Sequence, residues 1–231
     1  MKRLAGPALV GLVVAGSVSW LLSRGGPPSH AVSKYPARFA VRGLDVSHHN
    51  GLIDWPRVAQ SGVSFVYVKA SEGGDVADAR FAENLRGARA AGLKAGAYHF
   101  FTFCRPGEDQ AKQFLSLVKM APGDLPPAVD VEFVGNCRDR PSREVVRENL
   151  EQWLSLVEQA LGRRPVIYST PDAAAEFLGG LPHVLWLRQL PGEPQRPWAF
   201  WQFDPSGSIP GIAGPVDLDV FAGDRAALDA L

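Results

Sequence analysis

The stretch FVYVKASEGGDVADARFAENLRGARAAGLKAGAYHFF, residues 65–101, decides the fold class. Its first six and last seven residues are apolar and aromatic runs of the length that is typical of buried strands. Between them, Phe81, Leu85 and Ala88 recur at helical spacing, and Gly92 is suited to close that helix. A strand, a helix and a strand in this order predict two parallel strands joined by a helix.

The same alternation continues on both sides of this stretch. We expect strands at residues 41–46, 65–70, 95–101, 128–133, 165–169, 184–190, 199–203 and 216–221, and helices at 53–61, 78–91, 106–118, 142–161 and 171–178. The last three strands are joined by Pro/Gly-rich loops without helices. The sequence therefore predicts the α/β class, as a TIM-like barrel of five β/α units followed by three β-strands with few helices, with its functional residues at the C-terminal strand ends.

Composition and the N-terminal segment limit the partners and the location. The chain has 231 residues, 46% of them hydrophobic, and 24 basic and 24 acidic side chains, so one large domain with a full core is expected and nucleic acid is not an expected partner. Residues 1–24 carry Lys2 and Arg3 before a long apolar run, which indicates either a cleaved signal peptide or a retained membrane anchor. Residues 25–39 form a Pro/Gly/Ser tether, and 40–231 form the barrel. Both alternatives place the barrel outside the cytoplasm, in the periplasm, secreted or anchored facing outward.

Two carboxylates stand close together at the end of the fourth predicted strand. Asp130 and Glu132 are two positions apart, so they point to the same face, roughly 6.6 Å apart along the backbone. Like charges in a half-buried site raise one pKa and keep one carboxyl protonated, which is the pair that glycoside hydrolysis uses. The alternative is a structural role, as a helix cap or as partners of Arg138 or Arg140.

The other predicted strand ends add more polar and aromatic residues to the same rim. They include Asp45, Ser47, His48 and His49; Lys69, Ser71 and Glu72; Tyr98 and His99; Tyr168 and Ser169; Gln189; Trp201 and Gln202; and Asp217 and Asp219. Carboxylates, amides and aromatic faces around one cleft suit a carbohydrate ligand.

Five blocks, in order, resemble glycoside hydrolase family 25, the Chalaropsis-type lysozymes or N-acetylmuramidases. They are GLDVS at 43–47, VKASEG at 68–73, AGLKAGAYHF at 91–100, LPPAVDVE at 125–132 and WQFDPSGSIPGIAGPVDL at 201–218. The resemblance covers about residues 41–231 and implies cleavage of the β-1,4 bond between N-acetylmuramic acid and N-acetylglucosamine in peptidoglycan.

The resemblance also implies roles for individual residues. Glu132 would be the acid, Asp130 its partner, and Asp45 and Asp217 would complete the acidic cluster. Tyr98, Tyr168, Trp201 and Gln202 would contact the sugar. The sequence leaves open whether Asp130 positions the substrate acetamide or acts as a base, and so whether the enzyme retains or inverts configuration.

This chain departs from the family pattern at three places. Asn50 stands where Gln is frequent, Leu187-Arg188 replaces a stretch that usually has Ala before an aromatic residue, and Asp219 replaces a frequent Asn. No carboxylate is lost, so the departures bear on substrate preference more than on activity. Trp186 is expected to be a packing residue, and Glu72 a partner of Lys69.

The only two cysteines, Cys104 and Cys137, follow the third and fourth strands and are expected to meet in a disulfide on the catalytic rim. The His48-His49 pair, with Asp45, His99 and Glu132, suggests a metal site as an alternative. Adjacent strand residues point to opposite faces, so only one of the two histidines would face such a site, and we expect no metal and no cofactor. The expected partner is peptidoglycan, bound by a monomer. Two other functions remain open: a metal-dependent glycan hydrolase or deacetylase, and a non-catalytic peptidoglycan-binding barrel.

Overall fold

A ring of eight strands organises the part of the chain, residues 33–231, that the computed structural model describes. The ring contains β1 (Arg42–Val46), β2 (Phe65–Glu72), β4 (Lys94–Phe100), β5 (Ala128–Val131), β6 (Val166–Ser169), β7 (Leu185–Arg188), β8 (Phe200–Gly207) and β9 (Val216–Phe221). A short strand, β3 (Val76–Ala77), pairs with the end of β2 outside the ring. Pairing between β1 and β2 closes the ring, so the predicted barrel is confirmed.

One strand runs against the others. β1, β2 and β4 to β8 pair in parallel in the order of the sequence, but β9 is antiparallel to both β8 and β1. The expectation of a parallel sheet is therefore wrong for the last strand. Its N-terminal end, and not its C-terminal end, lies at the rim where the other strands end, and Asp217 is paired with Asp45 across that edge.

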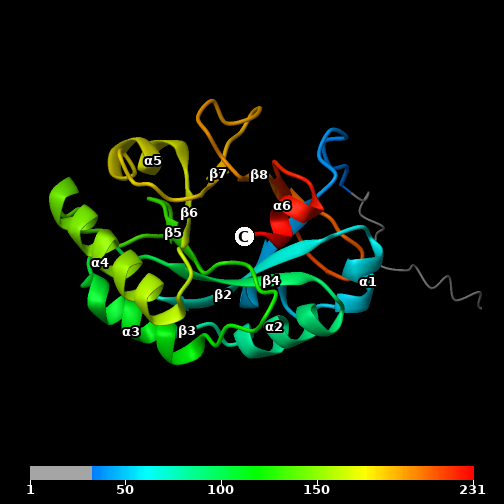
Figure 1. The fold of residues 1–231 in the computed structure, drawn as a ribbon, viewed down its shortest axis with the longest axis horizontal. Helices are drawn as coiled ribbons and strands as arrows, with labels where there is room; N and C mark the ends of the chain where they lie inside the picture. The colour runs from blue at the N-terminus through cyan, green and yellow to red at the C-terminus, as the bar shows by residue number, and fades with distance from the viewer. Residues whose placement is uncertain (1–32) are drawn as a thin grey trace, which may run out of the picture. The chain divides into compact units, whose positions relative to one another are not determined.

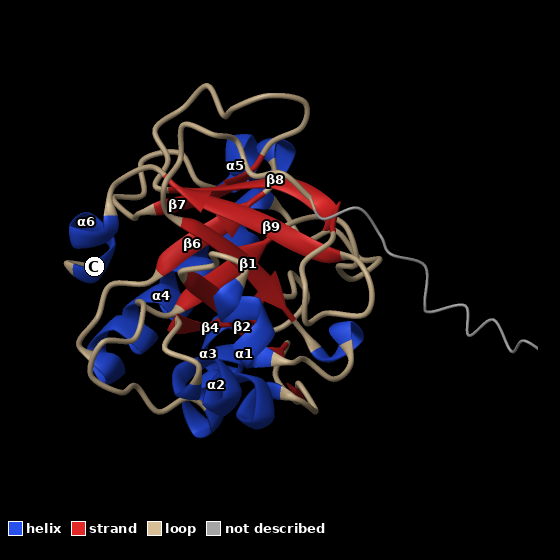
Figure 2. Cartoon of the chain, turned by 90° about the vertical axis from the view of Figure 1, so that its right-hand side faces the viewer, coloured by secondary structure: helices blue, strands red, loops and turns tan. Residues whose placement is uncertain are grey.

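Helices follow each of the first five barrel strands, as expected, and no helix separates β7, β8 and β9. They are α1 (Trp55–Gln60), α2 (Phe81–Ala90), α3 (Gly107–Leu117), α4 (Arg143–Leu161) and α5 (Pro171–Phe177), with α6 (Arg225–Asp229) after the last strand. Figure 1 shows α2, α3 and α4 along one side of the sheet, and Figure 2 shows β8 and β9 facing the viewer without a helix over them.

The helix ends have local causes in the sequence. The Ser142 side chain accepts a hydrogen bond from the Val145 backbone N–H at the start of α4, and Gly162 ends that helix in the left-handed conformation with φ 64°. Asp54 caps α1 in the same way as Ser142, with Pro56 in the first turn. These caps satisfy backbone groups that would otherwise lack partners, and they fix where each β/α unit turns back.

Two separate apolar clusters lie on the two faces of the barrel wall. Inward residues such as Phe65, Tyr67 and Phe200 fill the ring, and outward residues such as Val66 belong to the cluster that also contains helix residues such as Leu150 of α4. The alternation of faces along each strand sends successive residues to different clusters. The same alternation decides which polar side chains reach the inside of the barrel.

The segment before β1 is packed on the barrel. The Tyr35 hydroxyl donates to the Gly43 carbonyl at 2.8 Å, the Ser33 backbone N–H donates to the Ser208 carbonyl at 3.0 Å, and Phe39 meets Trp198 edge-on. Contacts with the barrel therefore begin before residue 40, inside the predicted tether. The predicted signal or anchor, residues 1–24, lies outside the described residues. Within residues 33–231, no helix has both the length and the apolar character needed to cross a membrane.

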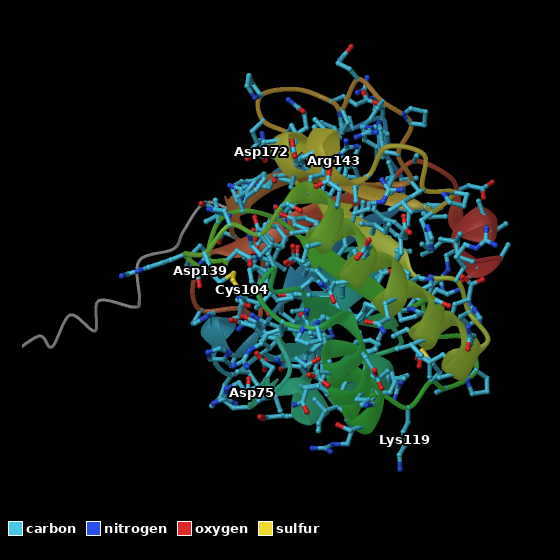
Figure 3. All side chains as sticks on the ribbon, turned by 90° about the vertical axis from the view of Figure 1, so that its left-hand side faces the viewer. Asp75, Cys104, Lys119, Asp139, Arg143 and Asp172 are labelled. Atoms are coloured by element: carbon cyan, nitrogen blue, oxygen red, sulfur yellow. A yellow bond between two sulfur atoms is a disulfide. The ribbon has the colours of Figure 1, made fainter. Side chains whose placement is uncertain are left out.

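A disulfide joins two loops at the rim. Cys104, after β4, is bonded to Cys137, after β5, with their Cα atoms 6.3 Å apart. Figure 3 shows this bridge beside Asp139. The predicted pairing is confirmed, and it ties the loop that follows Glu132 to the neighbouring loop.

Candidate active site

An acidic cavity of about 200 Å³ opens inside the barrel at the rim where the parallel strands end. Every side chain that lines it comes from a barrel strand or from the residue directly after one: Asp45, Tyr98, Asp130, Glu132, Tyr168, Trp186, Arg188, Gln202 and Asp217. Seven of the eight residues proposed from the sequence for catalysis or sugar contact are among them. The exception is Trp201.

Strand geometry explains why these residues meet. β5 ends at Val131, two residues earlier than predicted, so Glu132 is the first residue beyond the strand and Asp130 lies one step deeper. Asp217 reaches the cavity because β9 runs antiparallel and begins at this rim. Cα pairing of Asp45 with Asp217 and of Asp130 with Tyr168 places side chains from neighbouring strands at the same level.

Burial shifts the protonation of the Asp130 and Glu132 pair. Desolvation is the largest cause of a rise in the pKa of Glu132 to about 7, and Arg188 opposes that rise. Desolvation also raises the pKa of Asp130 well above its ordinary value, and the nearby Glu132 carboxylate adds to the rise. Asp130 Oδ1 and Glu132 Oε2 are buried and have no hydrogen-bond partner among the described residues. The pair therefore holds a proton near neutral pH, and two of its oxygen atoms are buried without a protein partner.

A second acidic group lies across the cavity. Burial and the Asp217 and Asp219 carboxylates raise the pKa of Asp45 well above its ordinary value, and burial raises the pKa of Asp217 to about 6. The Tyr168 hydroxyl donates to Gln202 Oε1 at 3.1 Å, and Gln202 Nε2 donates to Asp45 Oδ2 at 2.8 Å. This chain of hydrogen bonds fixes the Gln202 amide and the Asp45 carboxylate before any ligand arrives.

The aromatic residues form the wall and the floor. Trp186 is 2% exposed, stacks on Tyr67 with ring centroids 4.8 Å apart, and donates from Nε1 to Asp219 Oδ1 at 2.8 Å. Burial raises the pKa of Tyr98 and Tyr168 well above the ordinary value, so both hydroxyls stay protonated and able to donate. Trp186 was expected only to pack, but it does both: it packs in the barrel and lines the cavity.

Two cations border the acidic pair. Lys69 Nζ donates to Glu72 Oε2 at 2.7 Å, which confirms that Glu72 is a partner of Lys69, and Lys69 lowers the pKa of Asp130. Arg188 Nη1 lies 3.8 Å from Glu132 Oε2, and Arg188 lowers the pKa of both Glu132 and Asp217. Arg188 was noted in the sequence as a departure from a family pattern but was not proposed as a site residue. Its position two residues after Trp186, on the same strand face, was the available signal.

Trp201 lies on the other side of the barrel wall. Adjacent strand residues face opposite ways, and in β8 it is Gln202 that faces the cavity. Trp201 is 6% exposed, packs near Phe39 and Trp198, and donates from Nε1 to the Gln189 carbonyl at 3.1 Å. The structure does not bring it to the cavity that the other proposed residues share.

The histidines at this rim do not join the cavity either. His48 and His49 lie in a short 3-10 helix, not in a strand, and their ring centroids are 3.9 Å apart, so the expectation that they point to opposite faces is wrong. Both the backbone N–H and Nδ1 of His48 lie within hydrogen-bonding distance of Asp78 Oδ2. His99 points outward and is fully buried between Ser71, Gln110 and Trp153. Within residues 33–231, no three histidine, cysteine or acidic side chains are arranged to hold a metal ion.

Comparison with known proteins adds to this geometry. Residues 44–212 match the family described as Glycosyl hydrolases family 25. The chain belongs to this family. It is 35% identical over 208 residues to the uncharacterised protein YegX of Escherichia coli K12, covering 85% of this chain and 75% of YegX. It is 33% identical over 213 residues to lysozyme M1 of Streptomyces globisporus, covering 83% of this chain and 71% of that lysozyme.

Solved structures agree with the assignment. A family 25 glycosyl hydrolase from Bacillus anthracis superposes with a TM-score of 0.81 at 32% identity, covering 87% of this chain and 98% of that one. The bacterial lysozyme from Streptomyces coelicolor superposes with a TM-score of 0.76 at 32% identity, covering 83% and 96%. The protein is therefore a glycoside hydrolase of family 25.

Two further departures from the family 25 pattern have local structural explanations. Asn50 Oδ1 accepts from the Ser47 backbone N–H at 2.9 Å, and Asn50 Nδ2 donates to the Pro215 carbonyl at 3.1 Å, so Asn50 ties the loop after β1 to the residue before β9. Asp219 is the acceptor for Trp186. Both residues support the cavity wall without lining it.

Proposed function

We propose that this family 25 enzyme hydrolyses the β-1,4 bond between N-acetylmuramic acid and N-acetylglucosamine in peptidoglycan, with Glu132 as the general acid. The observation that carries the proposal is the carboxyl pair itself. Glu132 lines the cavity, has a pKa of about 7 and has a buried oxygen without a hydrogen-bond partner, and a second carboxyl, Asp130, lies one step deeper in the same strand. A carboxyl that is protonated near neutral pH can give its proton to the leaving oxygen of a glycosidic bond.

Glu132 and Asp130 lie at different depths in the cavity, and this difference suggests different roles for them. The Glu132 side chain is 15% exposed. It follows directly after the last residue of β5, at the rim of the barrel, where it can reach the bond between two sugar rings. Asp130 is buried deeper, beside Lys69, and is placed to act on the sugar from within the cavity. It either orients the acetamide group, whose oxygen then attacks the anomeric carbon, or it activates water. The first-formed anomer separates these routes, because acetamide attack followed by water retains configuration and direct attack by water inverts it.

The remaining lining residues bind and polarise the substrate. Asp45 and Asp217 stabilise the positive charge that develops on the sugar ring in the transition state. Gln202, already held by Tyr168, and the Tyr98 hydroxyl bond to sugar oxygens. Trp186, which is 2% exposed and stacked on Tyr67, contributes to the cavity wall by packing behind these groups. The lysozymes of Streptomyces globisporus and Streptomyces coelicolor among the related proteins support this choice of substrate.

The location follows from the substrate. Peptidoglycan lies outside the cytoplasm, so the enzyme acts there, and the Cys104–Cys137 disulfide suits an oxidising compartment. We propose that residues 1–24 direct export, either as a cleaved signal or as a retained anchor, and that the barrel works as a monomer. Mass measurement of the protein recovered from the membrane and from the medium distinguishes cleavage from retention.

The deciding experiment is digestion of purified peptidoglycan, followed by borohydride reduction and mass spectrometry of the fragments. We expect reduced muramic acid ends with the wild type and none with Glu132→Gln. Glu148→Gln, an exposed carboxyl on α4, is the matched control and should behave as the wild type. Release of acetate without new reducing ends, or loss of activity with a chelator, would instead indicate a metal-dependent deacetylase or hydrolase. Binding to peptidoglycan without any product would indicate a non-catalytic barrel.

A further inference from the structure

A second hollow adjoins the catalytic cavity, and Arg188 lines both. This hollow has a volume of about 320 Å³ and lies between α5 and the loop that joins β7 to β8. Its walls include Pro171, Ala174 and Ala175 on α5 and Gln189 and Arg196 on the loop. The lining combines alanine, proline and leucine side chains with two glutamines and two arginines, and Arg188 is the residue that the groove shares with the catalytic cavity.

Neither arginine makes a side-chain hydrogen bond in the described part of the chain, and the one ion pair of Arg188, with Glu132, is long. Arg188 lies 3.8 Å from Glu132 Oε2, which is longer than a hydrogen bond. Arg196 makes no ion pair and no side-chain hydrogen bond within residues 33–231. A guanidinium group has five N–H donors in a planar fork that fits a carboxylate. Both side chains are partly covered, so they present these donors from defined positions.

The loop that carries these residues is attached to the barrel. The Gln189 backbone N–H donates to the Gln202 carbonyl at 3.3 Å, and the Gln189 carbonyl accepts from Trp201 Nε1 at 3.1 Å. Trp198 packs edge-on against Phe39, and Glu193 forms an ion pair with Arg38. Trp201, which does not line the catalytic cavity, therefore has a role in holding this loop. A groove held in this way is ready to bind before the ligand arrives.

The charges around the groove indicate which ligand suits it. The catalytic cavity contains four carboxyl groups, Asp45, Asp130, Glu132 and Asp217, and those that are ionised disfavour an anionic substituent on the bound sugar. Asp172, at the start of α5, adds an acid near Arg188, but the Thr170 hydroxyl donates to it and it is exposed (Figure 3). An anionic substituent that leaves the cavity toward α5 meets Arg188 first and then the groove with Arg196.

We propose that this groove binds the short acidic peptide that peptidoglycan carries on the lactyl group of N-acetylmuramic acid. The inference rests on the proposed function, since it names the substituted form of the same substrate. Small apolar walls suit an alanyl residue next to the sugar, and the arginines pair with the peptide carboxylates beyond it. The enzyme then prefers glycan with acidic peptides over the same glycan with neutral ones.

The test uses two synthetic tetrasaccharides of alternating N-acetylglucosamine and N-acetylmuramic acid. One carries L-alanyl-D-glutamate on its lactyl groups, and the other carries the neutral diamide of the same dipeptide. We expect the wild type to have a kcat/KM about 10-fold higher for the acidic substrate, mainly through a lower KM, as a charge-assisted hydrogen bond provides. Arg196→Gln should lose most of this preference by raising KM for the acidic substrate, and Arg196→Lys should keep part of it.

Arg86→Gln removes the same charge from an exposed site on α2 and serves as the control, with the preference unchanged. A wild type that cleaves both tetrasaccharides equally well, or an Arg196→Gln variant that keeps the full preference, would overturn the proposal while leaving the proposed function intact. A wild type that cleaves neither would overturn both.

Discussion

The two faces of the same barrel strands carry two polar clusters that differ in one respect. On the outer face, His99 is within hydrogen-bonding distance of Ser71 Oγ through Nδ1 at 2.8 Å and of Gln110 Oε1 through Nε2 at 3.1 Å. On the inner face, buried oxygens of Asp130 and Glu132 have no partner among the described residues. Both ring nitrogens of His99 therefore have partners within the protein, whereas the acidic pair on the inner face keeps two buried oxygens without one.

The two clusters also differ in protonation: the histidine on the outer face keeps one charge state near neutral pH, and the acid on the inner face does not. Burial lowers the pKa of His99 to about 3, so its ring stays neutral over the working pH range, with Nε2 as donor to Gln110 and Nδ1 as acceptor from Ser71. Burial raises the pKa of Glu132 to about 7, so this group changes charge near neutral pH. Unpartnered buried oxygens that also line a cavity and change charge near neutral pH, as in the acidic pair, indicate a functional site.

Removing the proton donor on the inner face should have the largest effect. Glu132→Gln keeps the size of the side chain but cannot transfer a proton, so we expect turnover of peptidoglycan to fall by about 10²–10⁴-fold. Release of reducing ends measures the loss, and circular dichroism checks that the fold is kept. Activity within a few-fold of the wild type would show that the inner cluster is not the reacting one.

Substitutions of the other three carboxyl groups on the inner face should reduce activity to different degrees, and their order tests the role given to each. Asp130→Asn should lose most of the activity, because it changes the partner of the acid. Asp45→Asn and Asp217→Asn should lose less, because these residues adjust the field and hold hydroxyl groups. The kcat of each variant on one peptidoglycan preparation gives the ranking, and a greatest loss at Asp217 would mean that the reacting pair is misassigned.

A change on the outer face should lower the stability of the fold and leave the catalytic rate nearly unchanged. Gln110→Leu removes the acceptor of His99 and of the Thr102 backbone N–H, and it leaves both donors buried. We expect the free energy of unfolding to fall by about 2–4 kcal/mol, with kcat within a few-fold of the wild type at a temperature where the variant is folded. Denaturant unfolding measures the first quantity. A variant of unchanged stability that had lost its activity would contradict the contrast between the faces.

Ionisation of Glu132 on the inner face should lower the stability of the fold as pH increases. Because the pKa of Glu132 rises from 4.5 to about 7 on folding, the unfolded chain loses its proton first as pH increases, and the folded state is progressively destabilised between these values. Glu132→Gln removes this penalty. We expect it to be more stable than the wild type by about 1–3 kcal/mol at pH 8, with the gain disappearing near pH 4. Unfolding curves at both pH values test this, and a gain that is larger at pH 4 would contradict it.

The smallest expected effect concerns the cation beside the acid. Arg188 lowers the pKa of Glu132, so Arg188→Gln should raise that pKa and keep the acid protonated to a higher pH. The basic limb of the profile of kcat against pH should then move upward. The Arg86→Gln variant provides the matched control, and a limb that stays in place or moves down would exclude this role.

Much of the site was predictable because the signals are local. The position of Asp130 and Glu132 two residues apart, and the ends of the predicted strands, were enough to place Asp45, Tyr98, Tyr168 and Gln202 at one rim. The same rule of alternation shows that Trp201 and Gln202 cannot both face the cavity. The outward position of His99 follows in the same way from the inward position of Tyr98.

The sequence alone determined the alternation of strands and helices, the absence of helices between the last three strands, the acidic pair and the family, because periodicity, turns and short motifs are properties of neighbouring residues. Only the tertiary structure decided the antiparallel direction of β9, the approach of Arg188 to Glu132 and the disulfide geometry. It also decided that Asp217 reaches the cavity from the first residues of its strand. These features depend on how distant strands pair when the barrel closes, and strand pairing joins residues that have no local relation in the chain.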